Sequence, residues 1–274
     1  MASVNRRVLP GFSLTLGYTV FYLGLLVLLP ITAVFIKAGS LSLHDFLGAV
    51  WTERARAAYL LTFGTSFLAA LTNVVLGALI AWVLTRYTFP GKRLLDALVD
   101  LPLALPTAVG GLVYASLYVE NGWLGRHLVP LGIRGAYTRL GIVLVLIFVG
   151  LPFVVRTVQP VLEDLDPEAE EASSSLGATR WQTFAFVILP TLYPALITGF
   201  ALAFARSIGE YGSVVFISGN MPFKTEIAPI LIVARLEEFA YGEATAIAVV
   251  LLVISFSMLL VINLLESWSR RHDR

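Results

Sequence analysis

The chain has 274 residues, of which 58% are hydrophobic and only 14% are charged. Soluble globular domains carry about 25% charged residues, so this composition excludes an ordinary soluble protein and indicates an integral membrane protein. The formal net charge of +1 argues against a nucleic-acid partner. Because the chain contains no cysteine, disulfide bonds and thiolate metal sites are excluded.

Four charge-free apolar runs approach or exceed the roughly 20 residues that a helix needs to cross a bilayer. These runs are 13–36, 59–85, 101–119 and 244–265. Two further spans are predicted over 140–161, with Arg156 near one end, and upward from Pro190. The prediction is therefore an all-α integral membrane protein with six transmembrane helices, in which residues 13–266 form a single transmembrane domain.

Basic residues close to the ends of the spans predict the orientation of the chain. Arg6 and Arg7 precede the first span, whose apolar run is longer than the roughly 7–15 residues of a signal-peptide core. The turn at 86–93 and the positions 270–271 are also basic. Cytoplasmic loops carry an excess of Lys and Arg. We therefore expect both termini, the segment 1–12 and the basic tail 267–274, in the cytoplasm.

A stripe of small and polar residues marks one face of the second span. One such residue occurs at every fourth position: Thr65, Ala69, Asn73, Gly77 and Ala81. They share one helix face, and small residues allow another helix to approach closely inside a membrane. The stripe predicts helix packing within the bundle, with a contact between Asn73 and a substrate as the alternative.

The third span is interrupted by residues that weaken a helix. Pro102 and Pro106 each lack an amide hydrogen, and Gly110 and Gly111 follow them. We therefore expect a bent or broken helix. Irregular backbone at membrane depth is tolerated where protein or a water-filled path surrounds it, so this span is either a wall of a transport pathway or a packing kink.

Arg206 and Glu210 are ionisable residues inside the span that begins at Pro190. They lie four residues apart and therefore on one helix face. Charged groups within a membrane span are costly, which makes them functional candidates by default. One hypothesis is that Arg206 offers positive potential to an anion while Glu210 holds it between transport events. The other is a mutually neutralising pair at a helix interface.

The longest polar stretch, 163–177, comes shortly before the span at Pro190. Asp166 can cap a helix whose first residue is Pro167, and further acidic residues lie near the positive end of its dipole. Gly177 is suited to end that helix in the left-handed conformation, and Thr179 can cap a second helix. We predict two short helices, within about 163–190, that lead directly into a span.

The residues of this element resemble the EAA signature of ABC importer permeases, a Glu-Ala-Ala, Gly, Ile-x-Leu-Pro pattern. The matching residues are Glu171, Ala172, Ser173, Gly177, Leu189 and Pro190. Ser173 replaces the second alanine, and Val187 replaces the isoleucine. The resemblance implies a type I ABC importer permease fold with a cytoplasmic coupling element. In that family the element inserts into a cleft of a separate nucleotide-binding subunit and converts its ATP-driven closure into movement of the membrane helices.

The stretch after this signature resembles the oxyanion-importing branch of the family. Residues 205–212 and 218–220 carry the likeness, and 210–229 is most similar to the T-type, or U-type, permease of sulfate/thiosulfate importers. The resemblance implies a bacterial inner-membrane complex with a paralogous W-type permease, two ATPase subunits that bind ATP and Mg, and a periplasmic sulfate/thiosulfate-binding protein. Molybdate or tungstate import stays open, because sulfate and molybdate are both tetrahedral dianions.

The sequence contains no Gly-x-x-x-x-Gly-Lys-Ser/Thr loop, so we expect ATP to be bound by another chain and this chain not to be an enzyme. We also expect no cofactor or metal on it. Its histidines are far apart and are interpreted as surface residues: His44, His127 and His272.

An ion-gradient-driven secondary transporter is an alternative, but it needs acidic residues at a midplane site, for which only Glu210 and Asp100 are candidates. A membrane-embedded assembly or signalling subunit would not require the broken third span.

Overall fold

The computed structural model describes residues 12–272, which form helices and loops without a strand in that range. The long helices are α1 (Phe12–Leu23), which continues through a π-helical turn (Gly24–Leu28) into α2 (Leu29–Gly39), then α4 (Glu53–Arg86), α9 (Arg139–Glu163), α12 (Leu189–Ile208) and α15 (Tyr241–His272). The shorter helices are α3 (Leu43–Val50), α5 (Lys92–Val99), α6 (Leu101–Ala104), α7 (Thr107–Tyr118), α8 (Gly125–Leu128), α10 (Pro167–Ser175), α11 (Arg180–Thr183), α13 (Val214–Ile217) and α14 (Ala228–Glu237). Arg6 and Arg7, on which the predicted orientation partly depends, lie outside the described residues. Residues 267–272 of the predicted tail are the last residues of α15. Residues 273–274 also lie outside the described residues.

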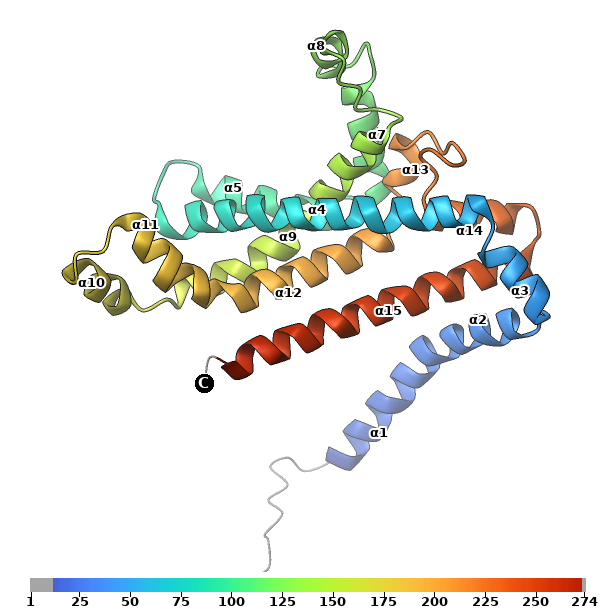
Figure 1. The fold of residues 1–274 in the computed structure, drawn as a ribbon, viewed down its shortest axis with the longest axis horizontal. Coiled ribbons are helices and arrows are strands. Elements are labelled where there is room, and N and C mark those ends of the chain that lie inside the picture. Colours follow the sequence, from blue (N-terminus) through green and yellow to red (C-terminus); the bar gives the residue numbers. More distant parts are fainter. Residues whose placement is uncertain (1–11, 273–274) are drawn as a thin grey trace, which may run out of the picture.

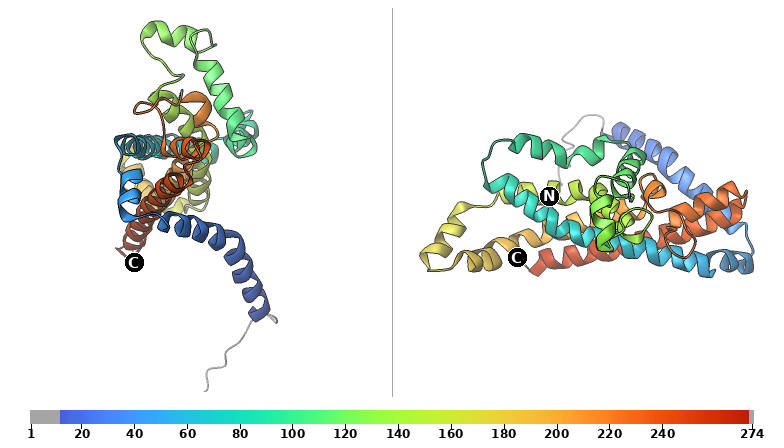
Figure 2. Two further views of the ribbon diagram at one scale, coloured as in Figure 1. Left: turned by 90° about the vertical axis from the view of Figure 1, so that its right-hand side faces the viewer. Right: turned by 90° about the horizontal axis from the view of Figure 1, so that it is seen from above.

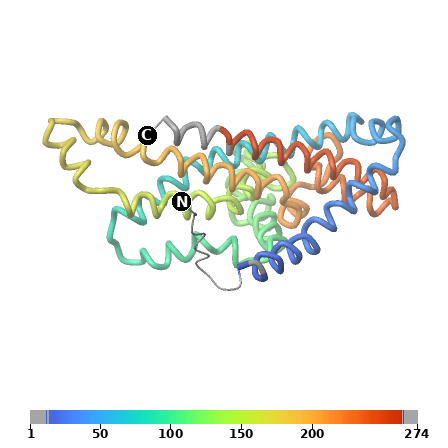
Figure 3. Tube along the Cα trace, turned by 90° about the horizontal axis from the view of Figure 1, so that it is seen from below, coloured from blue at the N-terminus to red at the C-terminus, as the bar shows by residue number. Residues whose placement is uncertain are grey.

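Five helical segments within residues 12–272 are long and apolar enough to cross a membrane. They are Leu14–Gly39, Glu53–Arg86, Arg139–Glu163, Arg180–Ile208 and Tyr241–Ile262. Each corresponds to one of the predicted spans. The four long helices after α3, namely α4, α9, α12 and α15, run roughly along one common direction (Figure 3).

The third predicted span, 101–119, is not one continuous helix. The structure divides it into α6 and α7, with Leu105 in an extended conformation at φ −82° and ψ 137°, followed by Pro106. The 12 residues of α7 rise roughly 18 Å, short of a hydrocarbon core of about 30 Å. The expected set of six spans is therefore five long helices and this interrupted segment, broken as the prolines predicted.

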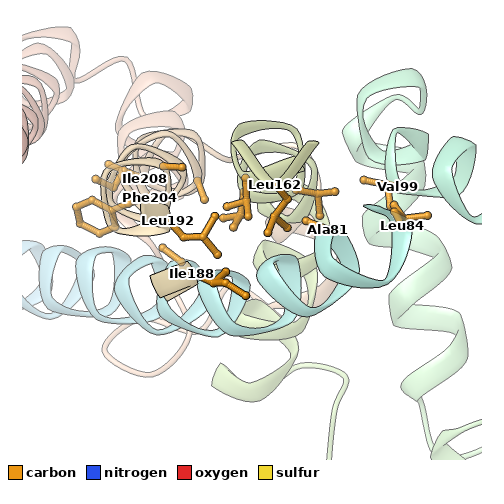
Figure 4. Close-up of a cluster of buried hydrophobic side chains, with 14 residues drawn as sticks. Ala81, Leu84, Val99, Leu162, Ile188, Leu192, Phe204 and Ile208 are labelled. Atoms are coloured by element: carbon orange, nitrogen blue, oxygen red, sulfur yellow. The ribbon is translucent and has the colours of Figure 1, made fainter. Parts of the chain in front are cut away.

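The core of the bundle lies between α4, α9 and α12. Leu84 of α4, Val155 of α9 and Phe204 of α12 belong to one cluster of buried apolar side chains, which is drawn in Figure 4. The predicted stripe on α4 faces this core, where Asn73 is fully buried. A Cβ added to Gly77 would lie 2.8 Å from the Cβ of Val154. The stripe is therefore a packing face for α9, as predicted.

The two ends of the bundle carry different elements. Helices α10 and α11 lie at one end, and α3 and α14 lie at the other (Figure 1). Helix α7 leaves the side of the bundle and carries α8 at its far end (Figures 1 and 2). Helix α1 lies apart from the bundle and is exposed along its length (Figure 2). An apolar helix exposed in this way must be covered by lipid or by another chain, because water is a poor solvent for it.

Candidate functional site

The predicted two-helix element, residues 163–190, is present with the predicted caps. The Asp166 side chain accepts a hydrogen bond from the backbone N–H of Glu168 at 2.9 Å, and Pro167 is the first residue of α10. Thr179 caps α11 in a reciprocal arrangement with Gln182, whose side chain accepts from the Thr179 backbone N–H at 2.8 Å. These local bonds satisfy amides that a helix start leaves unpaired.

Gly177 makes the turn between the two helices. Its φ of +82° lies in the left-handed region, which a residue with a Cβ adopts only at a cost of about 1–2 kcal/mol. The N–H of Gly177 bonds to Ser174 O at 3.0 Å, and the N–H of Ala178 bonds to Ser173 O at 3.1 Å. Both bonds satisfy carbonyl groups at the end of α10. The role predicted for Gly177 in the turn is confirmed.

Hydroxyl groups and an ion pair fix the element to itself and to the bundle. Ser173 of α10 and Thr183 of α11 share a hydrogen bond of 2.6 Å between their hydroxyl oxygens. Glu170 of α10 forms an ion pair with Arg86, the last residue of α4. The Arg86 guanidinium also lies over the ring of Trp82, 5.3 Å from its centroid. Sequence reasoning missed the pair to α4, for which the basic turn at 86–93 was the one available signal.

The free surface of the element carries large apolar side chains. Leu176, beside the glycine turn, is 89% exposed, and Trp181 and Phe186 are 73% and 77% exposed. Glu171 and Ala172 are exposed as well. Apolar side chains in an otherwise polar segment at the end of a membrane bundle are typical of a protein–protein contact.

The element continues into α12 without a loop. Helix α11 passes through a π-helical turn, Phe184–Ile188, directly into Leu189 and Pro190. The N–H of Leu189 bonds to Phe184 O, five residues back, and Pro190 has no N–H to donate. A force on α11 therefore reaches a membrane helix through continuous helical backbone, and α10 is joined to α11 by the turn at Gly177.

The candidate pathway residues of the third span have different surroundings. Pro102 of α6 and Gly110 of α7 are buried, whereas Pro106 is exposed at the break between the two helices. The tightest contact is at Gly111, where an added Cβ would lie 2.2 Å from the carbonyl oxygen of Ser213. The chain after α12 therefore packs directly on α7.

Arg206 and Glu210 form the predicted ion pair, with 2.6 Å between Arg206 Nη1 and Glu210 Oε2. The other Glu210 oxygen accepts from the backbone N–H and the hydroxyl of Ser213, at 2.8 and 2.9 Å. The Glu210 side chain is 2% exposed and that of Arg206 is 33% exposed. Helix α12 ends short of the end of the bundle that carries α3 and α14 (Figure 1). The pair therefore lies within the length of the bundle, with Glu210 buried and Arg206 partly accessible.

The described residues contain no group of three or more His, Asp or Glu side chains placed to hold a metal ion. His44 is almost fully exposed, and His127 accepts a hydrogen bond from its neighbour Arg126. The side chain of His272 lies outside the described residues.

A protein-family model described as "Binding-protein-dependent transport system inner membrane component" matches residues 73–271. The chain belongs to this family. The matched region begins within α4 and includes the coupling element, the broken α6–α7 segment and the Arg206–Glu210 pair. The protein is therefore a multi-pass membrane permease of an ABC importer, as the signature at 171–190 predicted.

Curated relatives and solved structures agree with this assignment. The permease is 53% identical over 254 residues to the sulfate transport system permease protein CysT of Synechocystis sp., covering 93% of this chain and 89% of that protein. It is 51% identical over 263 residues to CysT of Escherichia coli, covering 96% and 95%. Its fold matches a chain of a bacterial ABC transporter involved in import of the polysaccharide alginate, with a TM-score of 0.76, 16% identity and 95% coverage of each chain. That likeness shows the type I permease fold.

Proposed function

We propose that this permease carries sulfate or thiosulfate from the periplasm to the cytoplasm and forms half of the translocation pathway. The main support for this substrate is sequence identity above 50%, over nearly the whole chain, to permeases named for sulfate transport. The Arg206 side chain is partly accessible within the bundle. In this structure its charge is paired with Glu210, and when that pair opens during transport Arg206 offers the positive charge that a dianion needs where water is scarce.

The energy for transport comes from a separate ATPase that binds ATP and Mg and docks on the coupling element. The exposed Leu176 and Trp181 support this role, because they offer apolar contact area at the end of the bundle. We infer a complex of this permease with a paralogous W-type permease, two ATPase subunits and a periplasmic sulfate/thiosulfate-binding protein. A solved alginate transporter of the same fold is described in complex with a substrate-bound periplasmic protein.

In this proposal both termini and the coupling element are cytoplasmic. The lack of cysteine makes a direct test available. Ser175→Cys places one thiol on α10, and Ser40→Cys places one at the opposite end of the bundle, both at exposed positions. A membrane-impermeant maleimide added to intact spheroplasts should label the second variant, and the first only after lysis. Labelling of the Ser175→Cys variant in intact spheroplasts would contradict the orientation.

Uptake measurements test the substrate. Cells lacking their own sulfate permeases should regain saturable uptake of labelled sulfate and thiosulfate when this chain is expressed with its partner subunits. Substitution of the P-loop lysine in the ATPase should abolish that uptake. Uptake of molybdate without sulfate would favour the alternative cargo, and uptake that persists without an active ATPase would favour a secondary transporter.

A further inference from the structure

Arg156 of α9 binds the segment that leads into the broken third span through several hydrogen bonds. Its Nε and Nη2 donate to the two carboxylate oxygens of Asp100 at 2.9 and 2.6 Å. Its Nη1 donates to Asp96 Oδ1 at 2.6 Å, and Nη2 also donates to the backbone carbonyl of Asp96 at 2.9 Å. Asp96 lies in α5, and Asp100 lies between α5 and α6. The guanidinium thus holds the segment that leads to the break at Pro106.

The geometry of these bonds makes them stiff. A guanidinium that meets a carboxylate through two parallel bonds is fixed in angle as well as in distance. Next to it, Val99 at the end of α5 is buried in the same apolar cluster as Leu84 of α4 (Figure 4). The outward face of α5 is exposed at Leu94 and Leu98. The α5–α6 segment is therefore fastened to the bundle along one side only, with Arg156 as its polar attachment to α9.

The hydrogen bonds continue from Arg156 along α9 to the coupling element. Nη1 of Arg156 also donates to Gln159 Oε1 at 2.8 Å, and Gln159 Nε2 donates to Glu163 Oε1 at 3.1 Å. Glu163 is the last residue of α9, three positions before Asp166, the cap of α10. A chain of polar contacts along α9 thus connects the start of the coupling element with Asp96 and Asp100, directly before the third span.

We propose that Arg156 is a positioning residue that transmits movement of the coupling element to the broken third span. When the ATPase displaces α10, the end of α9 moves with it, and the forked bonds of Arg156 carry α5 and α6 along. The extended backbone at 105–106 then acts as the hinge about which α7 changes its angle. This inference rests on the proposed transport function and adds a route by which ATP hydrolysis reaches the pathway.

The test is the ratio of substrate uptake to ATP hydrolysis in the reconstituted four-subunit complex with its binding protein. Arg156→Gln removes the forked bonds to Asp100. We expect that variant to assemble and to hydrolyse ATP, while sulfate uptake per ATP falls about tenfold, within the range of typical coupling factors. The matched control is Arg235→Gln, which breaks the ion pairs of another half-buried arginine, to Glu238 and Glu243, outside this chain of contacts. Its ratio should stay at the wild-type value.

A purely structural role for Arg156 would lower uptake and hydrolysis together, and that parallel loss would overturn the inference. So would an unchanged ratio in the Arg156→Gln complex. If that variant does not assemble, Asp100→Ala decides, because it removes the forked bonds from the other side and leaves the bonds between Arg156 and Asp96 in place. An unchanged ratio in Asp100→Ala would then overturn the proposal. A wild-type complex without any ATP-driven uptake would instead contradict the proposed function.

Discussion

Ser173 and Thr183 join the two helices of the coupling element through their hydroxyl groups, 2.6 Å apart, on either side of the turn at Gly177. The position of Ser173 is the one at which the family pattern has alanine. This permease therefore has a cross-link that an alanine at the same position could not make. Thr183 is buried. An alanine at position 173 would leave its buried hydroxyl without this partner.

Ser173→Ala should loosen the coupling element without unfolding the bundle. Removal of one hydrogen bond to a buried group costs about 1 kcal/mol, so amide exchange of residues 167–190 should speed up about fivefold. Hydrogen exchange of the purified complex measures this. Ser175→Ala is the control, because the Ser175 hydroxyl bonds only within its own helix, to Glu171 O. Equal exchange in the two variants would show that the cross-link adds no rigidity.

Gly177→Ala should weaken docking of the ATPase. The left-handed φ of +82° makes a Cβ cost about 1–2 kcal/mol, which changes the angle between α10 and α11 or destabilises it. We expect the ATPase to be lost from the affinity-purified complex and ATP-driven uptake to fall. Gly48→Ala is the control, because Gly48 lies within helix α3 and an added Cβ would meet no atom within 4 Å. ATPase recovery equal to that of the control would contradict the prediction.

Leu176→Ala should lower the affinity for the ATPase directly. Leu176 is 89% exposed beside the turn, and full burial of a leucine in a partner contributes about 1.5–3 kcal/mol. A titration of labelled ATPase against the permeases in detergent should therefore show an affinity about tenfold lower or more. Leu43→Ala removes another largely exposed leucine, from the opposite end of the bundle, and should leave the affinity unchanged. The same loss in both variants would place the docking surface elsewhere.

Gly111→Ala should disturb α7, whereas Gly110→Ala should be tolerated. A Cβ at Gly111 would lie 2.2 Å from the Ser213 carbonyl oxygen, but one at Gly110 would lie 3.5 Å from the Phe148 ring. Overpacking of this kind costs about 1–3 kcal/mol. The comparison needs thermal unfolding in detergent and uptake. We expect a lower midpoint and lower uptake for Gly111→Ala alone. A matching decrease for Gly110→Ala would indicate that any side chain on this face is harmful.

Arg206→Gln should reduce stability and anion uptake. The substitution leaves the carboxylate of Glu210, 2% exposed, without its cationic partner. An uncompensated buried charge costs about 3–5 kcal/mol, and the two hydrogen bonds that Glu210 keeps from Ser213 offset part of this. The double variant Arg206→Gln/Glu210→Gln removes both charges and should regain stability. If Arg206 serves the anion, the double variant should still transport poorly at low sulfate. Wild-type uptake by the double variant would leave the pair with a structural role alone.

The sequence predicted the coupling element well because its signals are local. A cap such as Asp166, a first-turn proline and a glycine with positive φ act within three or four residues. The apolar runs likewise predicted the five long helices. The broken third span was predicted for the same reason, since Pro106 lacks its amide wherever it lies.

The ion pairs between residues far apart in the chain could not be predicted from the sequence. Glu170 meets Arg86 across 84 positions, and Arg156 meets Asp100 across 56. Nothing near Arg156 in the chain indicates which carboxylate it will bind. In the sequence Gly110 and Gly111 are alike, as two residues that weaken a helix, and only the approach of Ser213 distinguishes Gly111 from Gly110.

The sequence by itself determined that this protein spans a membrane, which parts of the chain form its long apolar helices, and that a capped helix pair precedes Pro190. Hydrophobicity and backbone conformation depend on the residue and its nearest neighbours, so the order of the residues is enough to specify them. Only the tertiary structure decided that Glu210 is buried while Arg206 is partly accessible, and that a chain of bonds links Glu163 to Asp100 through Arg156. These properties depend on which helices lie side by side, and packing settles that across the whole chain.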